Sequence, residues 1–558
     1  MRYLLWTIFS ASLLIISTIA SRPLLPVDET RYLTVAWEAH VTGDYLVSHL
    51  NTEMYAHKPP LLFWLINAVW STIGMNEYAA RLVSPLAGIA CLVLTAAMAR
   101  RLWPESVPLH RCAPMVLASS MLWMILCPLT MFDTLLTGCT LLALLGVLRA
   151  EAGNSWFGWM MAGIALGLGV LAKGPVVVVH VLPSALFAPW WSSRIRTSYS
   201  RWYFGCFTAI TIAATIGLSW ALSSAAAGGK AYGDELLYGQ TAGRMVNSFA
   251  HRHPFWWYLP WLPLFLLPWV SIRSVWQGIS ATKLDAPMKF LICWALSSLL
   301  ILSLVSGKQI HYLLPAFPAA ALILTRLLTA NPRVIPKQDL AFIIAGTIAL
   351  AISPILVNHL PLPYSAVIQN LIPDWYAVPL AACGILLIPW SFKRTEATVF
   401  AVGTASILFV VIVIVSARST LWKSFDFRPL AQTAASHGSN IAWHGLYEGQ
   451  LNYLGHVRYV HETRDVDELS QWLIQHRDGI LIKELSAANV DALKSAGIDA
   501  QYSGTVSSVE LEQITRIVRA DSEFPGHKWQ PTILDVFWIR PHFPMRIFVV
   551  VRFENPPS

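Results

Sequence analysis

Long apolar stretches recur from the first residues to about residue 416, and short polar segments separate them. A helix needs about 20 mostly apolar residues to cross the hydrocarbon core of a membrane. About thirteen segments meet this requirement and are predicted to span a bilayer: 3–20, 81–99, 112–131, 133–149, 156–172, 175–191, 203–223, 255–272, 287–305, 310–329, 339–357, 373–391 and 397–416. The shorter stretch 59–74 is predicted to be a re-entrant or interfacial helix. The first segment also fits a signal peptide, but the many spans that follow favour a retained helix.

The pattern changes after residue 416. Residues 417–558 combine a charged helical stretch at 464–476 with the strand-like runs GILIKEL, ILDVFWIR and IFVVVRF. A mixture of helix and strand patterns in so short a region is typical of one small α/β domain. The predicted fold is therefore an α-helical polytopic membrane domain over 1–416, with outer loops at 21–80 and 224–254, followed by a soluble α/β domain over 417–558.

Composition and charge agree with a membrane protein. The 558 residues are 55% hydrophobic and 13% charged, whereas soluble proteins contain about 25% charged residues. The net charge of +8 would suit either nucleic acid or anionic lipid. No nucleic-acid recognition motif accompanies it, so membrane lipids are the expected partner and nucleic acid is not. The seven cysteines show no metal-binding spacing and are interpreted as small buried hydrophobes.

The distribution of Lys and Arg predicts the orientation, because cytoplasmic loops are enriched in these residues. With the N-terminus inside, every inside loop is basic: Arg100, Arg101, Arg111, Arg149, Arg194, Arg196, Arg201, Arg273, Lys283, Lys289, Arg326, Arg333, Lys337, Lys393 and Arg394. An odd number of spans then places the C-terminal domain outside. The outside loops nevertheless keep several cations beside carboxylates, which indicates a function on the outer face. These residues are Arg31, Lys58, Lys173, Arg244, Arg252 and Lys308, with Asp28, Glu29, Asp133, Asp234 and Glu235.

The first outer loop is the richest in candidate chemistry. Apolar residues recur at helical spacing between Glu29 and Gly43, which predicts an amphipathic helix on the membrane surface with Asp28 at its start. His57 and Lys58 close the same loop. The structural alternative is that Asp28 only caps this helix and that Glu29 only complements its dipole.

Other polar residues lie at the outer ends of predicted spans. Asp133 lies between two spans, Lys173 precedes a Gly-Pro helix break, and Lys308 and Tyr312 lie at the start of the tenth span. Each also has a structural alternative as a helix cap, a snorkelling cation or an interfacial belt residue.

Carboxylates and cations at one membrane face suit transfer of a sugar from a lipid phosphate. The departing phosphate is a stable anion that needs positive charge more than an acid, and one carboxylate can accept a proton from the acceptor. The sequence contains no P-loop and no Rossmann glycine motif, which favours a membrane-soluble donor over a nucleotide sugar.

Several motifs in the same order resemble a known family. They are DETRY at 28–32, HKPP at 57–60, Asp133, KGP at 173–175, HPFWWYLP at 253–260 and KQIHYLLPAFP at 308–318. The chain resembles the polyprenyl- or dolichyl-phosphate-dependent GT-C glycosyltransferases of the protein-mannosyltransferase type, and most nearly the bacterial lipid A aminoarabinose transferases and their relatives. The resemblance implies inverting transfer of a sugar from undecaprenyl phosphate to lipid A or a related envelope glycolipid, at the periplasmic face of the bacterial inner membrane.

The resemblance also implies residue roles. Asp28 is expected to be the principal catalytic carboxylate, with Glu29 supporting it and Asp133 as the second acidic residue. The donor phosphate is expected to contact Arg31, Lys58, Arg244, Tyr312 and Lys173. Further cavity residues are expected to be Tyr55, His57, His253 and Lys308. The aminoarabinose transferases tend to carry Glu where this chain has His57, which leaves open a divalent metal at His57 and the identity of the sugar.

Two alternative functions remain at this point. One keeps the donor and replaces the acceptor by a protein hydroxyl. The other is a lipid or sugar transporter, but transporters often contain repeated halves with broken helices at the membrane midplane. The sequence shows no such repeat, and its polar residues gather at one face, so an enzyme is the favoured interpretation.

Overall fold

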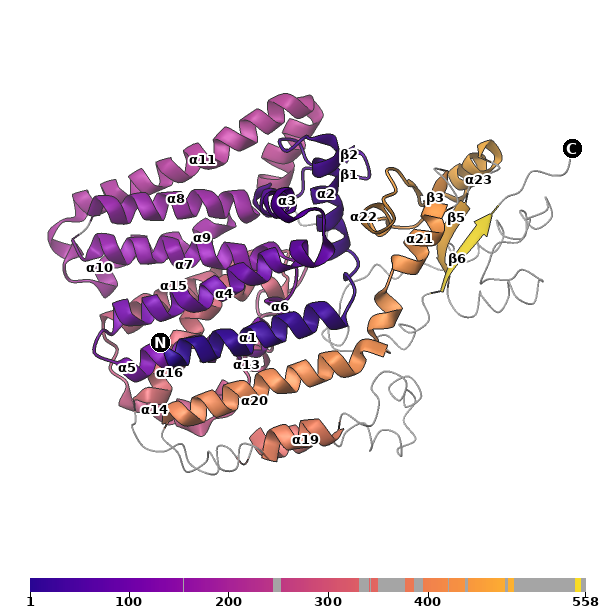
Figure 1. Ribbon diagram of the computed structural model, residues 1–558. Coiled ribbons are helices and arrows are strands. Elements are labelled where there is room, and N and C mark those ends of the chain that lie inside the picture. Colours follow the sequence, from indigo (N-terminus) through magenta and orange to yellow (C-terminus); the bar gives the residue numbers. More distant parts are fainter. Residues whose placement is uncertain are drawn as a thin grey trace, which may run out of the picture.

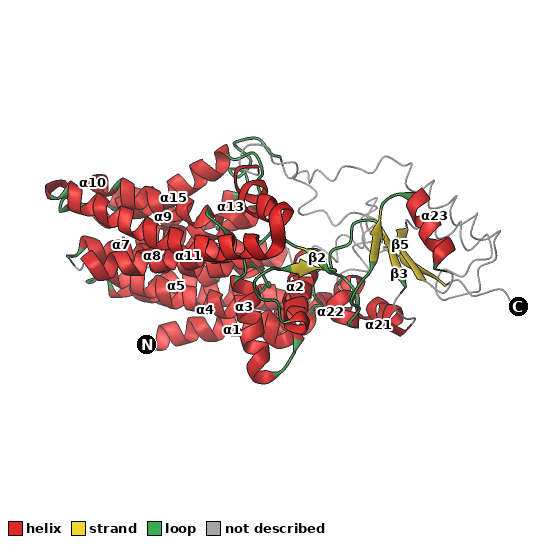
Figure 2. Cartoon of the chain, turned by 90° about the horizontal axis from the view of Figure 1, so that it is seen from above, coloured by secondary structure: helices red, strands yellow, loops and turns green. Residues whose placement is uncertain are grey.

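The computed structural model describes residues 1–153, 155–243, 252–330, 341, 343–349, 377–385, 395–419, 421–436, 440–476, 480–485 and 547–552. Most of the long helices lie side by side with their axes in a common direction, and the C-terminal sheet lies beyond one end of this bundle (Figures 1 and 2).

Eight helices within the described residues are long and apolar enough to cross a membrane. They correspond to the predicted spans 3–20, 81–99, 133–149, 156–172, 203–223, 287–305, 310–329 and 397–416. Their bounds are α1 Arg2–Ser21, α4 Glu77–Leu102, α7 Phe132–Glu151, α8 Ser155–Lys173, α11 Tyr199–Asp234 with the π-helix η2 Glu235–Gly243, α15 Ala286–Leu304, α16 Phe317–Thr329 preceded by the 3-10 helix η4 Ile310–Ala316, and α20 Thr395–Ser416.

Three predicted spans are not continuous helices. Residues 112–131 divide into α5 Val107–Ala118 and α6 Met121–Leu126. The hydroxyls of Ser119 and Ser120 donate to the carbonyls of Met115 and Val116 at 2.6 and 2.7 Å, a local bonding pattern that tends to bend helices.

Prolines explain the other two breaks. The span predicted at 175–191 divides into α9 Val176–Leu186 and α10 Ala188–Trp191, with Pro189 in the first turn of α10. The span predicted at 255–272 contains only α13 Leu262–Phe265 and the 3-10 helix η3 Trp269–Ser271, because Pro260, Pro263 and Pro268 interrupt it. The spans predicted at 339–357 and 373–391 lie mostly outside the described residues.

Close helix contacts set the positions of the site-bearing ends. A Cβ atom at Gly146 of α7 would lie 2.6 Å from the carbonyl oxygen of Gly158 in α8, and one at Gly158 would lie 2.4 Å from the backbone nitrogen of Ala150. Only glycine permits this approach of the two backbones. The start of α7 and the end of α8, which carry Asp133 and Lys173, are thereby brought to the same end of the bundle.

The helix predicted near residues 29–43 is present as α2 Asp28–Thr42. Much of α2 is buried against α3 Leu61–Ile73 and against a C-terminal loop. Thr30 and Thr34 donate hydrogen bonds to the carbonyls of Glu448 and Gly449 at 3.1 and 3.0 Å. The short apolar stretch predicted as a helix at 59–74 is α3.

The described C-terminal residues form a four-stranded sheet in the order β4-β3-β5-β6. The strands are β3 Ile441–His444, β4 His461–Thr463, β5 Ile480–Leu485 and β6 Ile547–Arg552, and β6 alone among them is antiparallel to its neighbour. Two of the predicted strand runs are therefore strands, whereas ILDVFWIR lies outside the described residues. The division of the chain at residue 416 stays a prediction.

The remaining elements are short. They are β1 His49–Leu50, β2 Glu53–Met54, η1 Ile195–Thr197, α14 Arg273–Ala281, α19 Ala377–Ile385, η7 Ala417–Ser419, η8 Trp422–Phe425, α21 Arg428–Ser436, α22 Asn452–Gly455 and α23 Val466–Gln475. The last of these corresponds to the charged helical stretch predicted at 464–476.

Candidate active site

Asp28 is the first residue of α2 and the most accessible carboxylate of the candidate site. Its side chain is 40% exposed. One carboxylate oxygen accepts hydrogen bonds from Arg31 and from the Tyr32 hydroxyl, both at 2.8 Å. The preceding residue, Val27, has φ of +77° and ψ of −72°, an unfavourable conformation for a β-branched side chain. Such strain persists only where surrounding contacts hold it, and it fixes where α2 begins.

Arg31 lies between two carboxylates. It pairs with Asp28 through one guanidinium nitrogen and with Glu448 through the other, at 2.8 and 3.0 Å. Glu448 belongs to the loop between β3 and α22, so the C-terminal part of the chain contributes directly to the surroundings of Asp28. The guanidinium also lies 5.5 Å from the Tyr32 ring.

A second charged cluster joins α7, α8 and η4. The Lys173 ammonium group is 2.6 Å from a carboxylate oxygen of Asp133 and 4.8 Å from the centre of the Tyr312 ring. The Asp133 side chain is only 3% exposed. A buried carboxylate without a cation would be strongly unfavourable, so Lys173 compensates Asp133 while it faces an aromatic ring.

Phe132 connects the two clusters. Its ring packs edge-on against Tyr32, which bonds to Asp28, with ring centres 4.8 Å apart. The Lys58 ammonium group lies 5.9 Å from the same Phe132 ring. Asp28, Arg31 and Lys58 are therefore linked through Tyr32 and Phe132, and Asp133, the next residue of α7, pairs with Lys173 beside Tyr312.

The electrostatic surroundings keep Asp28 ionised. Burial would raise the pKa of Asp28, but Arg31, the Tyr32 hydrogen bond, His311 and Lys58 together lower this pKa below its usual value. Glu448 shows the opposite result: burial and the charge of Asp28 raise its pKa, although Arg31 acts against them. The site thus holds one firmly ionised carboxylate and one whose charge is less favoured.

Glu29 faces away from Asp28. It forms a buried ion pair with Arg22 and accepts hydrogen bonds from the backbone amides of Leu25 and Thr130 at 3.0 and 2.8 Å. Burial opposes its ionisation, yet these donors lower the pKa of Glu29 to about 2. With its carboxylate fully engaged, Glu29 is placed to position α2 and not to touch a substrate.

The other predicted residues lie in less central surroundings. Tyr55 is buried with its ring 5.1 Å from that of the exposed His57, and His253 stacks on Trp257 with ring centres 4.3 Å apart. Lys308 is buried and donates to the carbonyls of His253, at 3.0 Å, and of Val305.

Lys308 therefore joins two segments of backbone, and burial lowers its pKa.

The predicted phosphate ligand Arg244 lies outside the described residues. Across the described ranges, no group of three or more His, Cys, Asp or Glu residues is arranged to hold a metal ion.

Comparisons with known proteins agree with this architecture. A family model described as dolichyl-phosphate-mannose-protein mannosyltransferase matches residues 57–220, a range that contains Lys58, Asp133 and Lys173. The chain is 30% identical over 323 residues to undecaprenyl phosphate-alpha-4-amino-4-deoxy-L-arabinose arabinosyl transferase 2 of Pseudomonas fluorescens. It is 28% identical over 353 residues to the corresponding transferase of Pectobacterium atrosepticum. These matches cover 53% and 60% of this chain, and 54% and 62% of the relatives.

Two solved structures share the fold. ArnT from Cupriavidus metallidurans, determined bound to undecaprenyl phosphate, superposes with a TM-score of 0.72 at 16% identity, over 88% of this chain and 94% of that one. The apo form of the same protein gives a TM-score of 0.70 over the same fractions of the two chains. The resemblance expected from the motifs is confirmed. The chain has the fold of ArnT, and its matched sequence spans little more than half of its first curated relative.

Sequence reasoning missed two residues that shape the site. Arg22 lies at the end of the first span and pairs with Glu29, and Glu448 lies 417 residues from Arg31. A cation at the outer end of a span was a usable signal for Arg22. Nothing in the pattern around Glu448 distinguishes it from an ordinary surface carboxylate, because its importance comes only from a long-range contact.

Proposed function

We propose that this chain transfers a sugar, 4-amino-4-deoxy-L-arabinose, from undecaprenyl phosphate to lipid A or a related envelope glycolipid. The observation that carries the proposal is the convergence of Asp28 with the cations Arg31, Lys58 and Lys173 at one end of the helical bundle. The names of the similar transferases support the donor and the sugar. The basic loops at the opposite end support a periplasmic site in the inner membrane.

The cations suit departure of a lipid phosphate. In the proposed reaction, an acceptor oxygen bonds to the anomeric carbon while the bond from that carbon to the phosphate oxygen breaks. The bonding electrons leave with the phosphate, whose negative charge increases. Arg31 and Lys58 are placed to stabilise that charge, and preorganised positive groups act most strongly where charge develops.

Asp28 is the proposed proton acceptor and orients the attacking hydroxyl. The neighbouring cations lower its pKa while no donor is bound, which makes the carboxylate a weak base. A bound donor phosphate would neutralise part of the charge of Arg31 and Lys58, so the pKa of Asp28 would rise toward its usual value. The proton of the acceptor then moves to Asp28 as the new glycosidic bond forms.

The proposal is tested with Asp28→Asn, which keeps the shape of the side chain and removes the base. The transfer rate to lipid A should fall at least about a hundredfold, as is typical for loss of a general base. Mass spectrometry of lipid A from cells with and without the protein measures this transfer. Glu53→Gln is the matched control, because Glu53 is an exposed carboxylate of the same loop. Near-normal transfer by a well-folded Asp28→Asn variant would contradict the assignment.

A protein acceptor is the second candidate, since the matching family model describes a protein mannosyltransferase. The same cells distinguish the two acceptors. Lipid A that stays unchanged while secreted or periplasmic proteins lose a glycan mass would favour a protein hydroxyl over lipid A.

A further inference from the structure

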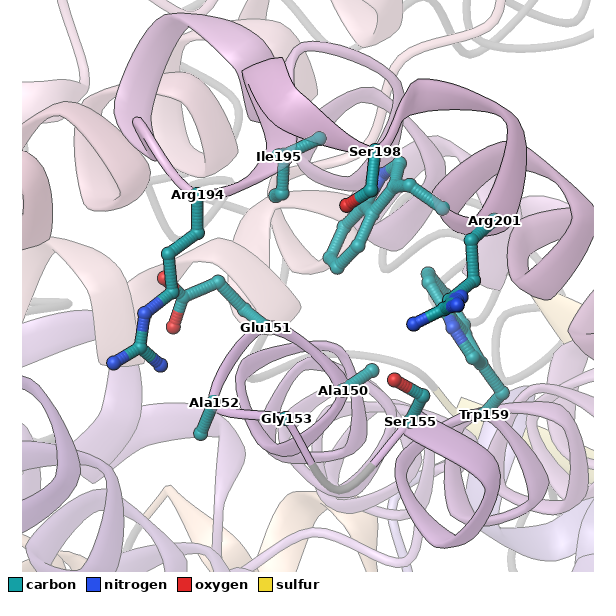
Figure 3. A pocket seen from close by; sticks show the side chains of 11 residues that line it. Ala150, Glu151, Ala152, Gly153, Ser155, Trp159, Arg194, Ile195, Ser198 and Arg201 are labelled. Atoms are coloured by element: carbon teal, nitrogen blue, oxygen red, sulfur yellow. The ribbon is translucent and has the colours of Figure 1, made fainter.

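A polar pocket lies at the opposite end of the helical bundle from Asp28. Its volume is about 440 Å³, and it opens between the turn that joins α7 to α8 and the segment that leads into α11 (Figure 3). The helix α8 starts at this pocket and ends at Lys173, and its 19 residues correspond to roughly 28 Å of helix. This length is close to the hydrocarbon thickness of a bilayer, so the pocket lies at the other membrane face.

The pocket contains two arginines that are not neutralised. Arg194 and Arg201 line it from different sides, and Arg201 extends toward its middle (Figure 3). Neither guanidinium forms an ion pair with any carboxylate that the structure describes. The lining carboxylate, Glu151, already accepts a hydrogen bond from Ser192 at 2.8 Å and lies 3.6 Å from Arg101. The pocket therefore presents net positive charge.

Hydroxyl and aromatic groups complete the lining. Ser155 and Ser198 contribute hydroxyls, and Ser198 directly precedes the 36-residue helix α11. The rings of Trp159 and Trp202 form one wall, edge-to-face with centres 4.8 Å apart. Two cations, two hydroxyls and the positive end of a long helix are the groups that proteins use to bind phosphate.

The surface beside the pocket is apolar and exposed. Close in sequence to the lining residues of the same helices, Trp156, Phe157 and Met160 of α8 and Phe204 and Phe207 of α11 are 49% to 66% exposed. A soluble phosphate would gain nothing from this surface. The acyl chains of a lipid would lie against it while the headgroup occupied the pocket.

We propose that this pocket binds the phosphate headgroup of an anionic phospholipid from the leaflet opposite to the transfer site. The proposal is independent of the sugar and acceptor assigned above. Arg194 and Arg201 hold the phosphate, and the aromatic surface of α8 and α11 accommodates the acyl chains. Anionic lipids are enriched in the leaflet that basic loops face, which agrees with the predicted orientation.

The test is retention of phosphatidylglycerol by the full chain, extracted from nanodiscs of phosphatidylcholine and phosphatidylglycerol and examined by native mass spectrometry. The double variant R194Q/R201Q should retain phosphatidylglycerol about thirtyfold less well, because each basic residue near an anionic surface contributes about a factor of five. R196Q is the matched control. Arg196 lies between the two in sequence, is exposed, bonds to the carbonyl of Pro189 and does not line the pocket.

Arg201→Lys keeps the charge and should retain the lipid, which separates loss of binding from loss of folding. Equal retention by the wild type and R194Q/R201Q would overturn the proposal. So would displacement of the bound lipid by millimolar inorganic phosphate, since that result would make the ligand a soluble anion. Because the readout is lipid binding, its outcome does not depend on whether lipid A is the acceptor.

Discussion

At the scale of single residues, Glu29 stabilises the start of α2. Its buried carboxylate pairs with Arg22 and accepts two backbone hydrogen bonds. Replacing Glu29 by Gln leaves the Arg22 charge buried without its partner, so we expect a loss of about 3 kcal/mol in stability. The melting temperature of the purified protein in detergent measures this effect, and the exposed Glu53→Gln should leave it unchanged.

The pKa of Glu29 also predicts how the stability of the protein depends on pH. The pKa of Glu29 is about 2 in the folded protein, below its usual value of 4.5. Its ionisation therefore stabilises the fold fully above about pH 4.5, and that contribution decreases as the pH falls toward 2. Wild-type protein should lose stability over this range more steeply than Glu29→Gln. Parallel melting curves for the two proteins between pH 5 and 3 would contradict the role given to Glu29.

A third prediction at the residue scale concerns how activity depends on the ionisation of Asp28. Its pKa is lowered in the free protein by Arg31, Tyr32, His311 and Lys58, against the effect of burial. If donor phosphate neutralises these cations, the acidic limb of kcat should lie at higher pH than the acidic limb of kcat/KM, which reports the free enzyme. Rates measured from pH 4 to pH 8 with saturating and with limiting donor test this order. Coincident limbs would mean that the donor phosphate does not change the surroundings of Asp28.

At the scale of elements, the contact between α2 and the C-terminal loop depends on Gly449. This residue has φ of +72°, and a Cβ atom there would lie 2.7 Å from the Thr34 hydroxyl oxygen. Gly449→Ala should therefore loosen the loop from α2, with faster hydrogen exchange in both segments. Gly43→Ala is the control, because Gly43 has a similar φ of +75° but open space around its missing Cβ. The left-handed conformation costs a non-glycine residue about 1–2 kcal/mol in either variant. A larger increase in hydrogen exchange for Gly449→Ala than for Gly43→Ala would report the clash with Thr34. Equal increases in the two variants would show that the contact accommodates the added Cβ atom.

The elements also show what the hydrophobic pattern could predict. Apolar length located the eight long helices because a bilayer requires such length, and the strand runs at 480–485 and 547–552 followed from β-rich composition. The same criterion treated 255–272 as a span although its prolines prevent a continuous helix. Hydropathy averages over a window, whereas a helix break depends on single residues such as Pro263 or Ser119.

The candidate site was predictable only in part. Asp28, Arg31, Lys58, Asp133 and Lys173 were identified as polar residues kept at a hydrophobic boundary, and the structure brings them together. Sequence position alone did not separate Asp28 from Glu29, since both begin the same helix. Their side chains point in different directions, because Asp28 bonds to Arg31 and Tyr32 whereas Glu29 pairs with Arg22. These partners are set by the fold.

At the scale of the whole molecule, several contacts join the C-terminal part to the first outer loop. Asn51 exchanges two hydrogen bonds with the backbone of Val460, at 2.7 and 2.8 Å, and Arg428 pairs with Glu77 at 2.8 Å. The position of Glu448 beside Arg31 is therefore set by several separate contacts. Residues distant in sequence act on Asp28 through this arrangement.

Glu448 should consequently affect both donor binding and chemistry. Its carboxylate shares Arg31 with Asp28, and its negative charge competes with a donor phosphate for the guanidinium. Glu448→Gln removes that charge, so the KM for the lipid-linked donor should fall several-fold. The same change removes a negative neighbour of Asp28, which lowers the pKa of Asp28 further and weakens it as a base. We therefore expect kcat to fall together with KM, measured with purified protein and a synthetic polyprenyl-phosphate sugar.

A purely structural role for Glu448 predicts a different result. Loss of docking would lower the melting temperature and raise the KM, because Arg31 and α2 would be less well held. Glu53→Gln again serves as the control for loss of a carboxylate from this end of the molecule. An unchanged melting temperature with lower KM and lower kcat would show that the C-terminal part adjusts the charge at Asp28. A higher KM with a lower melting temperature would show that it acts only as a support, since a charge effect on Arg31 moves KM in the opposite direction.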